Sequence, residues 1–433
     1  MSEGAQANGG ATSNGGVAGA PAQGGMSGAS GLAGSTGGAM ASAGFPGTAG
    51  GTGGKGGSAG TGAAGASGAG TAGKSGAGAG GAGAAGQGGA SAAGQGGTAA
   101  GGSAVGPTCK QAGGNRCATA ASDCAGLTTF ASSDCAACCL VPQNPVYGSF
   151  PDPFVVRVGD TYHAFATGQN IPRITSKDLD TWKAEGKSLN PGPWADQTLD
   201  HWAPTAYQAK DKTWVMFYAG VVQGSGQHCL GRATSSSVTG MFVETSNTPF
   251  ICKSGGLWSL DPSVFQDPTT GKDYLVWRQD TAAMPHGTVH IRELDNTGHL
   301  TGTEHQLIER ASAEPSWEFD ASGGVMENPA MIHAGGTYHL FYSANRWETA
   351  SYATGHAHCD TPVGPCTKTS TTSPWQGSLG KMLGPGGADF VKAADGTTFM
   401  YMHGWESPDV GPGVGARKLW FYRFETPPKI APL

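Results

Sequence analysis

Three acidic side chains stand just before prolines at widely separated points of the chain, in Asp152-Pro153, Asp261-Pro262 and Glu327-Asn328-Pro329. A proline at this place removes a backbone donor and fixes a strand start, which directs the preceding side chain away from the sheet. Carboxylates that converge repel each other unless one stays protonated, so such a trio suits a general acid of raised pKa beside an ionised general base. Asp-Pro is also a common turn dipeptide. The recurrence of three acids at what we take as equivalent repeat positions favours the catalytic interpretation.

The acids open the units of a repeat that begins at Tyr147. Each unit has a polar or proline-containing opening, an alternating strand, a Gly/Asp/Lys turn and a second, aromatic-rich strand. Five units occur, spaced by 51, 58, 67 and 60 residues, with first-strand residues Phe154, Thr205, Ser263, Ala330 and Phe390. Each interval has room for two more short strands, and none carries a helical period with caps. The sequence therefore predicts an all-β fold, a five-bladed β-propeller, over residues 145–433. A β-sandwich is the alternative, but sandwich strands have no period of about 60 residues.

The chain before the propeller has a different composition. It holds 41 of the 76 glycines of the 433-residue chain within residues 1–106, which carry only three charged side chains. Such a segment cannot bury enough apolar surface to offset its conformational entropy, so we predict a disordered Gly/Ala/Ser-rich linker at 1–106. The net charge of −6 and the absence of long Lys/Arg runs make nucleic acid an unexpected partner. No apolar run is long enough to span a membrane.

Ten cysteines indicate an oxidising compartment. Six of them form a dense cluster that predicts a small disulfide-stapled segment at 107–144, namely Cys109, Cys117, Cys124, Cys135, Cys138 and Cys139. A zinc site is the alternative, but there is only one CxxC and no nearby histidine. The pairing within the cluster stays open, since six cysteines allow 15 connectivities. Cys359 and Cys366 are expected to close a local loop, and Cys229 with Cys252 is a candidate second bridge.

The motifs at the repeat openings resemble glycoside hydrolase family 43 over nearly all of residues 147–433. The matching stretches are Phe150-Pro-Asp-Pro-Phe-Val, His201-Trp-Ala-Pro, Leu260-Asp-Pro-Ser-Val-Phe, Val325-Met-Glu-Asn-Pro-Ala-Met-Ile, Leu340-Phe-Tyr-Ser-Ala-Asn, and Gly384-Pro-Gly-Gly with the later Tyr401-Met-His. The resemblance implies a five-bladed propeller that cleaves L-arabinofuranosyl or D-xylosyl linkages. It also implies that Asp152 is the general base, that Glu327 is the general acid, and that Asp261 orients Glu327 and raises its pKa. These roles suit an inverting mechanism, with carboxyl groups about 6.5–9.5 Å apart.

One departure from the family pattern concerns a metal. Many members carry a histidine after Gly-Pro-Gly that helps to hold an axial metal, commonly calcium, whereas here Gly387 and Ala388 stand at that place. We therefore expect no required cofactor, with axial calcium in doubt and Asp389 as the candidate metal ligand. His403 matches a second family histidine, although a lone strand histidine is more often a core residue.

Other residues are candidates for substrate binding. Trp202 and Phe154 flank the acid positions and would form an apolar floor for a sugar ring, and Trp347 would stack a further sugar. Core packing is the alternative for these three, and the favoured one for Phe154. Arg278 and Arg417 would donate hydrogen bonds to sugar hydroxyls, with plain surface placement as the competing interpretation.

The expected function is that of a monomeric, secreted, inverting glycosidase that removes α-L-arabinofuranosyl units from plant cell-wall arabinan or arabinoxylan. β-Xylosidase or endo-1,5-α-L-arabinanase activity is the alternative within the family, and a non-catalytic carbohydrate-binding propeller is the alternative of another class. We expect an extracellular or cell-surface location, with the export signal missing from this sequence and a membrane attachment only through a lost N-terminal lipid anchor. The linker would then act as a tether of roughly 50–60 Å.

Overall fold

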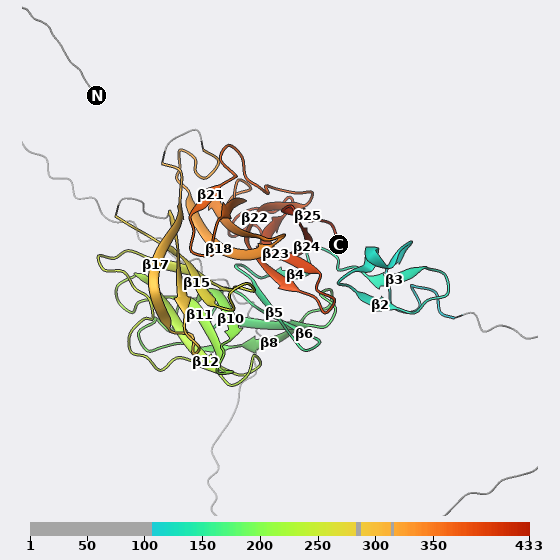
Figure 1. The fold of residues 1–433 in the computed structure, drawn as a ribbon, viewed down its shortest axis with the longest axis horizontal. Coiled ribbons are helices and arrows are strands. Elements are labelled where there is room, and N and C mark those ends of the chain that lie inside the picture. The colour runs from blue at the N-terminus through green and yellow to red at the C-terminus, as the bar shows by residue number, and fades with distance from the viewer. Residues whose placement is uncertain (1–105, 283–286, 313–315) are drawn as a thin grey trace, which may run out of the picture. The chain divides into compact units, whose positions relative to one another are not determined.

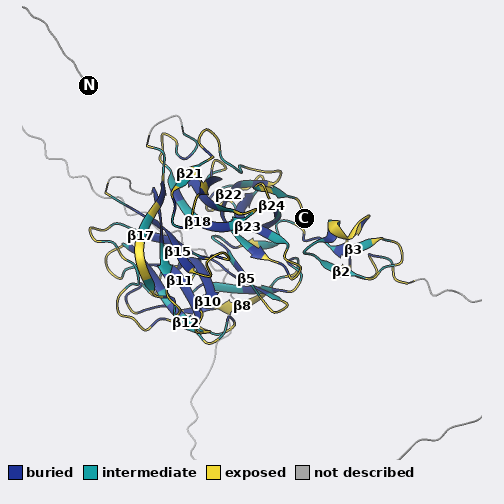
Figure 2. Ribbon diagram, in the orientation of Figure 1, coloured by how far each residue is buried: buried dark blue, intermediate teal, exposed yellow. Residues whose placement is uncertain are grey.

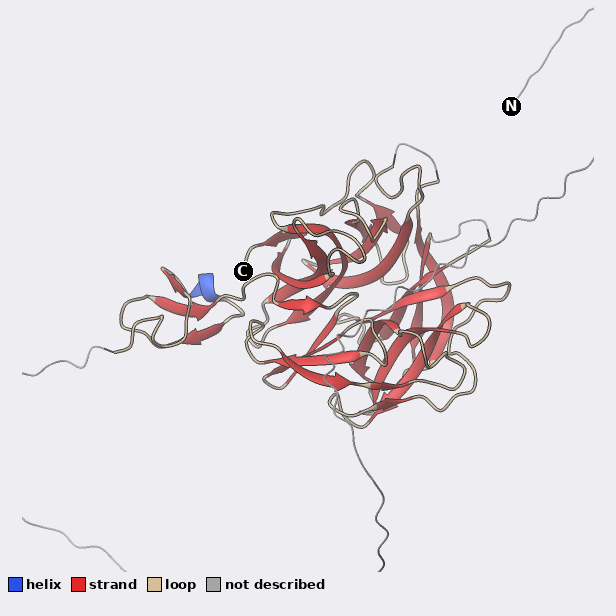
Figure 3. Ribbon diagram, turned by 180° about the vertical axis from the view of Figure 1, so that it is seen from behind, coloured by secondary structure: helices blue, strands red, loops and turns tan. Residues whose placement is uncertain are grey.

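The computed structural model describes residues 106–282, 287–312 and 316–433. The predicted linker at 1–106 lies outside these residues apart from Gly106, and the predicted segment boundaries stay predictions. The described residues all fall within one compact unit, Ala82–Leu433. They form strands and loops with a single 3₁₀ turn, Ala121–Cys124, and none of their helices could span a membrane. Figure 3 shows this turn as the one helical element among the strands.

Five antiparallel sheets follow one another along the chain. The first sheet contains β5 (Phe154–Val158), β6 (Thr161–Phe165), β7 (Pro172–Ser176) and β8 (Lys183–Lys187). The second contains β10 (Trp202–Gln208), β11 (Trp214–Val221), β12 (His228–Ser235) and β13 (Phe242–Val243), with β9 (Leu189–Asn190) parallel to β13. The third contains β14 (Ser259–Gln266), β15 (Asp273–Gln279), β16 (Thr288–Leu294) and β17 (Leu300–Glu309).

The fourth sheet contains β18 (Val325–Ala334), β19 (Thr337–Asn345), β20 (Ala353–Cys359) and β21 (Cys366–Lys368). The fifth contains β22 (Met382–Lys392), β23 (Thr398–Glu406), β24 (Lys418–Glu425) and β25 (Lys429–Ala431). The early strand β4 (Tyr147–Ser149) pairs with β24 of this last sheet (Figure 1). The start of the repeat region is thereby hydrogen-bonded into its final blade, which closes the ring of blades.

The first strands of the five sheets contact one another in a ring, in the order β5, β10, β14, β18, β22 and back to β5. This arrangement confirms the five-bladed β-propeller and excludes the sandwich. Inner strands such as β10 and β11 are buried on both faces, whereas the outer strand β8 is exposed along its whole length (Figure 2). The apolar core lies between neighbouring blades, where large side chains such as Trp277, Phe217 and Phe341 are fully buried.

One position of the repeat has a left-handed backbone conformation in every blade. It has a left-handed φ of +43° to +59°, and it is Asp152, Ala203, Asp261, Asn328 or Gly387. Four of the five precede a proline, and the strand pairing slips at this point in blades two to five. Asp152 and Asp261 are thus equivalent, but Glu327 is not: it lies one residue earlier, and Asn328 takes the equivalent place. By the same alignment, the residue of blade five at the position equivalent to Phe154 is Asp389, and not Phe390.

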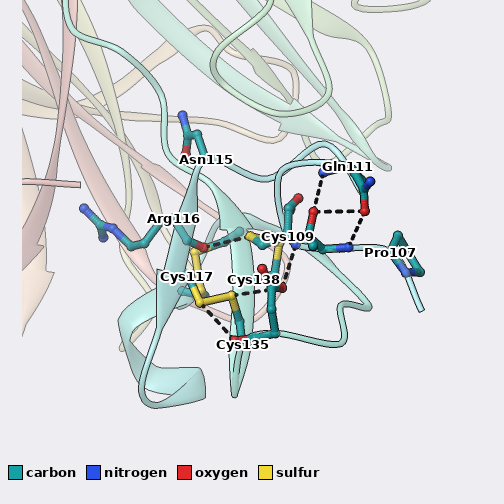
Figure 4. The surroundings of a disulfide bond; sticks show 12 residues. Pro107, Cys109, Gln111, Asn115, Arg116, Cys117, Cys135 and Cys138 are labelled. Carbon is teal, nitrogen blue, oxygen red and sulfur yellow. Dashed lines mark hydrogen bonds between the residues drawn. A yellow bond between two sulfur atoms is a disulfide. The ribbon is translucent and has the colours of Figure 1, made fainter. Parts of the chain in front are cut away.

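The cysteine-rich segment forms its own small sheet of β1 (Arg116–Ala118), β3 (Ala137–Leu140) and β2 (Thr128–Phe130), in that order. Three disulfides hold it, Cys109–Cys138, Cys117–Cys135 and Cys124–Cys139. Figure 4 shows the cysteines of the first two bridges. The Cys229–Cys252 and Cys359–Cys366 bridges are also present, so all ten cysteines are paired. The expected disulfides are confirmed, and with them the preference for disulfides over zinc.

This small sheet packs against blade five. The Arg423 guanidinium donates to the carbonyl oxygens of Asp123 and Ala125 at 2.8 and 3.0 Å, and the backbone N–H of Gly126 donates to Asp395 Oδ2 at 2.7 Å. The half-cystines Cys124 and Cys139 are buried in one apolar cluster with blade-five side chains that include Phe399 and Leu433. The Cys124–Cys139 bridge therefore belongs to the interface with the propeller.

Replacing both Cys124 and Cys139 with Ser should lower the free energy of unfolding by about 2–4 kcal/mol, because the cross-link is lost and a hydroxyl is buried among apolar groups. Urea unfolding of the full chain measures this change. The matched control is the Cys117→Ser, Cys135→Ser double variant, whose similar loop carries an exposed Cys117. We expect a smaller loss there, and equal losses in the two variants would contradict the interface assignment.

Candidate active site

One end of the propeller gathers the candidate residues, for a topological reason. In each blade the first and third strands run in the same direction, and the second strand runs back between them. The start of the first strand, the end of the second and the start of the third therefore lie at the same end. Asp152, Asp261 and Glu327 occupy first-strand starts. Second-strand ends and third-strand starts bring further side chains to this end, namely Thr167, Arg278, Trp347, Tyr352, Arg417 and His228.

Asp152 is surrounded by donors. Its Oδ1 accepts from Arg417 Nη1 at 3.2 Å and from Asn328 Nδ2 at 3.3 Å, and its Oδ2 accepts from the Thr167 hydroxyl at 2.7 Å. Burial raises the pKa of this carboxyl, but the Arg417 guanidinium and the hydrogen bonds outweigh burial and hold the pKa below its ordinary value. Asp152 is therefore ionised at neutral pH.

Glu327 lies in different surroundings. Its Oε1 accepts from the Tyr352 hydroxyl at 2.8 Å, and its Oε2 accepts from Arg278 Nη1 at 3.0 Å. Burial raises the pKa of Glu327, and the negative charge of Asp152 adds to this rise, while Arg278 and Tyr352 oppose it. The resulting pKa of Glu327 is above its ordinary value, whereas that of Asp152 is below its own, so Glu327 is the weaker acid of the two.

Asp261 reaches the site by a different contact from the one expected. Its Oδ2 accepts from the backbone N–H of Asn328 at 3.1 Å, so it holds the residue after Glu327 rather than the Glu327 carboxyl. Burial and the charge of Glu327 raise the pKa of Asp261 well above its usual range. Because the two carboxyls titrate together, they share a proton over part of the pH range. The direct contacts to Glu327 come from Arg278 and Tyr352.

Asn328 and Tyr352 connect the two carboxylates. Asn328 Nδ2 lies 3.3 Å from both Asp152 Oδ1 and the Tyr352 hydroxyl, which donates to Glu327 Oε1 at 2.8 Å. These three links limit the separation of Asp152 Oδ1 and Glu327 Oε1 to about 9.4 Å. The tyrosine ring fits because residue 386 is glycine: a Cβ there would lie 2.0 Å from Tyr352 Cε1.

Sequence reasoning missed four residues of this network: Asn328, Tyr352, Thr167 and Asp280, whose carboxylate accepts from Arg278 at 3.2 Å. Asn328 had a signal, since it precedes a proline as Asp152 and Asp261 do. The other three lie after second strands or before a third strand, where no repeated motif marks them.

The predicted binding residues take different places. Arg417 donates to Asp152 and its guanidinium carbon lies 4.7 Å from the centre of the Trp347 ring, which is 37% exposed, so these two form an accessible wall beside Asp152. Arg278 was expected to bind sugar hydroxyls or to lie on the surface, and it does neither. Its side chain is 3% exposed and binds Glu327 and Asp280. Phe154 is half-buried and stacks on Phe165, which agrees with the core alternative.

Trp202 and His403 have different contacts. Trp202 is half-buried and stacks on His228 at 4.2 Å. His403 is fully buried, and its Nδ1 accepts from the backbone N–H of Asp152 at 2.9 Å. Burial and the nearby Arg417 lower the pKa of His403 to about 3, so the ring is neutral and positions the backbone of Asp152.

The axial calcium site that the resemblance implies does not fit these residues. A small cavity at the ring of first strands is lined by the prolines and the residues beside them, and its carboxyl groups are those of Asp152, Asp261 and Asp389. Burial raises the pKa of Asp389 to about 7, and Ser263 Oγ lies 3.3 Å from its Oδ2. A Cβ at Gly387 would lie 2.8 Å from His403 Nδ1, so no histidine fits there while His403 keeps its position. Across the described ranges, no group of three acidic, histidine or cysteine side chains could hold a metal.

Three comparisons with known proteins show what this chain is similar to. The chain is 30% identical over 203 residues to an extracellular endo-alpha-(1->5)-L-arabinanase of Thermotoga petrophila, covering 36% of this chain and 41% of that protein. It is 26% identical over 223 residues to an extracellular exo-alpha-(1->5)-L-arabinofuranosidase of Streptomyces avermitilis, covering 49% of this chain and 44% of that protein. The matches therefore span less than half of either relative.

A solved structure shows the same fold. It is a thermostable family-43 glycoside hydrolase, with a TM-score of 0.58 and 24% identity, over 67% of this chain and 96% of that chain. The family model described as glycosyl hydrolases family 43 matches residues 142–422, which include every carboxylate of the site. The chain belongs to glycosyl hydrolases family 43.

Proposed function

We propose that this chain is an inverting glycosidase that removes α-L-arabinofuranosyl units from arabinan or arabinoxylan. The observation that carries the proposal is the pair of carboxyl groups in one hydrogen-bonded network, with the pKa of Asp152 held low and the pKa of Glu327 raised. One ionised base and one protonated acid are what hydrolysis with a single displacement requires.

Asp152 is the proposed general base. Its carboxylate takes a proton from a water molecule as the oxygen of that water attacks the anomeric carbon of the sugar. Arg417, Thr167 and Asn328 keep this carboxylate ionised and fix its orientation. The positive charge of Arg417 stabilises the ionised form of Asp152 across their hydrogen bond, and this lowers the pKa of Asp152.

Glu327 is the proposed general acid. It protonates the glycosidic oxygen as the bond to the anomeric carbon breaks, so the leaving group departs as a neutral alcohol. Tyr352 and Arg278 orient the two oxygens of Glu327. Asp261 positions the backbone beside Glu327 through the N–H of Asn328, and in its ionised form it opposes loss of the Glu327 proton.

The choice of sugar rests on the relatives and on the accessible Trp347 beside Asp152. The two curated relatives are named for α-1,5-linked arabinan chemistry, one with endo and one with exo action. Both are named extracellular, and five disulfides in this chain suit an oxidising compartment, so we propose secretion. Plant cell-wall arabinan or arabinoxylan would then be the partner that the enzyme meets.

Aryl α-L-arabinofuranoside, β-D-xyloside and β-D-galactoside, assayed beside linear arabinan with product sizing, test this proposal. We expect the arabinofuranoside to be cleaved fastest and arabinan to release arabinose. Faster cleavage of the xyloside, or release of oligosaccharides alone, would replace the proposal with the β-xylosidase or the endo-arabinanase alternative. Binding without any cleavage would leave a carbohydrate-binding propeller.

We also propose that no metal is required. A histidine at residue 387, where many family members carry one, would collide with His403. Dialysis against EDTA should leave both kcat/KM and the thermal unfolding midpoint unchanged. A loss of activity that calcium restores, with calcium recovered from the untreated protein by elemental analysis, would contradict this.

A further inference from the structure

Three aromatic rings form a stack at the active-site end of blades two and three, in which His228 lies at 28° to Trp202 and is tilted by 48° to Trp258. The His228 ring lies between Trp202 and Trp258, with ring centres 4.2 Å apart on each side. His228 is buried, whereas both tryptophans are half-buried, so the histidine is the interior of the stack and the indoles are its outer faces. Burial and Arg278 lower the pKa of His228 to about 4, so the stack is uncharged at neutral pH.

The loop that carries Trp258 is fixed at both ends. Cys252 at its beginning is bonded to Cys229, the residue after His228. The side-chain amide of Gln227 donates to the carbonyl oxygens of Lys253 at 2.6 Å and Leu257 at 2.7 Å, which ties the two arms of the loop together. Gly255 and Gly256 both adopt a positive φ at the turn, with nothing within 4 Å of either Cβ position. The disulfide and the Gln227 hydrogen bonds therefore hold Trp258 in place, although no side chain packs against the turn at Gly255 and Gly256.

The stack adjoins the side of the site that holds Glu327. The carbonyl oxygen of Trp258 accepts from the backbone N–H of Asp280 at 2.9 Å. Asp280 in turn binds Arg278, and Arg278 donates to Glu327 Oε2 at 3.0 Å. The other accessible aromatic, Trp347, lies over Arg417 on the Asp152 side. The stack is thus linked to Glu327 through Asp280 and Arg278, whereas Trp347 is linked to Asp152 through Arg417.

We propose that Trp258 and Trp202, held together by the buried His228 between them, form a binding surface for the sugar residue on the leaving-group side of the scissile bond. The proposal rests on the proposed function, because the acid Glu327 must face the leaving oxygen and the sugar that carries it. Flat, rigid and uncharged aromatic faces suit the apolar C–H face of a sugar ring. The enzyme would therefore prefer oligosaccharides over aryl glycosides, whose leaving group has no second sugar.

Comparison of an arabino-oligosaccharide with an aryl α-L-arabinofuranoside tests this surface. We expect Trp258→Ala to lower the ratio of kcat/KM for the oligosaccharide to that for the aryl glycoside by about three- to tenfold, mainly through KM. Trp258→Phe, which keeps an aromatic face, should restore most of the ratio. The Cys229→Ser, Cys252→Ser double variant and Gln227→Ala, which release the loop, should lower the ratio in the same direction.

Two matched controls separate this role from stability. The Cys359→Ser, Cys366→Ser double variant removes a disulfide between β20 and β21 at the other end of blade four, and Met241→Ala removes a 49% exposed apolar side chain from blade two. Both should leave the ratio at its wild-type value. A lowered unfolding midpoint with an unchanged ratio in Trp258→Ala would overturn the inference. Failure of the wild type to cleave either substrate would instead overturn the proposed function.

Discussion

Replacing Glu327 with Gln should reduce hydrolysis of arabinan by about 10²- to 10⁴-fold, because the leaving oxygen then departs without a proton. The same variant should lose much less activity on an aryl arabinofuranoside with a nitro-activated leaving group, which departs readily as an anion. Asp152→Asn should lose a similar factor on both substrates, since water must be activated whatever the leaving group. Asn is the suitable replacement at residue 152, because this residue has φ +47°, a conformation that Asn tolerates better than Ala.

Steady-state kinetics of the two variants on both substrates measure this difference. Glu425→Ala is the control: this glutamate is 43% exposed in its side chain and pairs with Lys429 at the far end of β24. It should keep wild-type kcat. Equal losses for Glu327→Gln on both substrates would refute its role as the acid, and full activity of Glu327→Gln on arabinan would do so outright.

Replacing Asp261 with Asn should lower kcat on arabinan by about 10- to 100-fold, because the carboxyl that accepts from the Asn328 backbone N–H and shares a proton with Glu327 is lost. The pH profile should change as well. The active form has ionised Asp152 and protonated Glu327, so activity falls as the pH drops through the lowered pKa of Asp152 and falls again as it rises through the raised pKa of Glu327. While the two carboxyls share one proton, ionised Asp261 opposes the ionisation of Glu327; Asn cannot carry that charge, so the pKa of Glu327 should fall and the alkaline limb of kcat/KM should move to lower pH.

Profiles of kcat/KM against pH for the wild type and Asp261→Asn measure this shift. Asn also tolerates the φ of +54° at residue 261, so the backbone is preserved. An alkaline limb that stays in place, or moves to higher pH, would show that Asp261 does not support the protonated form of Glu327.

The hairpin repeat made the propeller predictable, because strand alternation and turn residues are local signals. The acids at its openings were found for the same reason. The sequence did not show that Glu327 lies one residue before the strained position, which Asn328 takes. Only the shifted strand pairing reveals this offset. Sequence spacing alone cannot show such a bulge.

Arg278 and Tyr352 show a second limit of sequence reasoning. A surface arginine and a buried arginine look alike in a sequence, and Arg278 is buried beside two carboxylates, Asp280 just after its own strand and Glu327 from β18 of the next blade. Tyr352 enters the site because residue 386, some 30 positions later, is glycine. Such contacts depend on the closure of the ring of blades, and no local pattern encodes them.

The anomeric configuration of the first product, followed by ¹H NMR at early times of arabinofuranoside hydrolysis, tests the central claim most directly. An inverting enzyme in which Asp152 activates water and Glu327 protonates the leaving group should release β-L-arabinofuranose from an α-linked substrate, before mutarotation mixes the anomers. Initial release of the α-anomer would mean that a carboxylate attacks the sugar itself, and it would contradict the assignment of Asp152 as a general base.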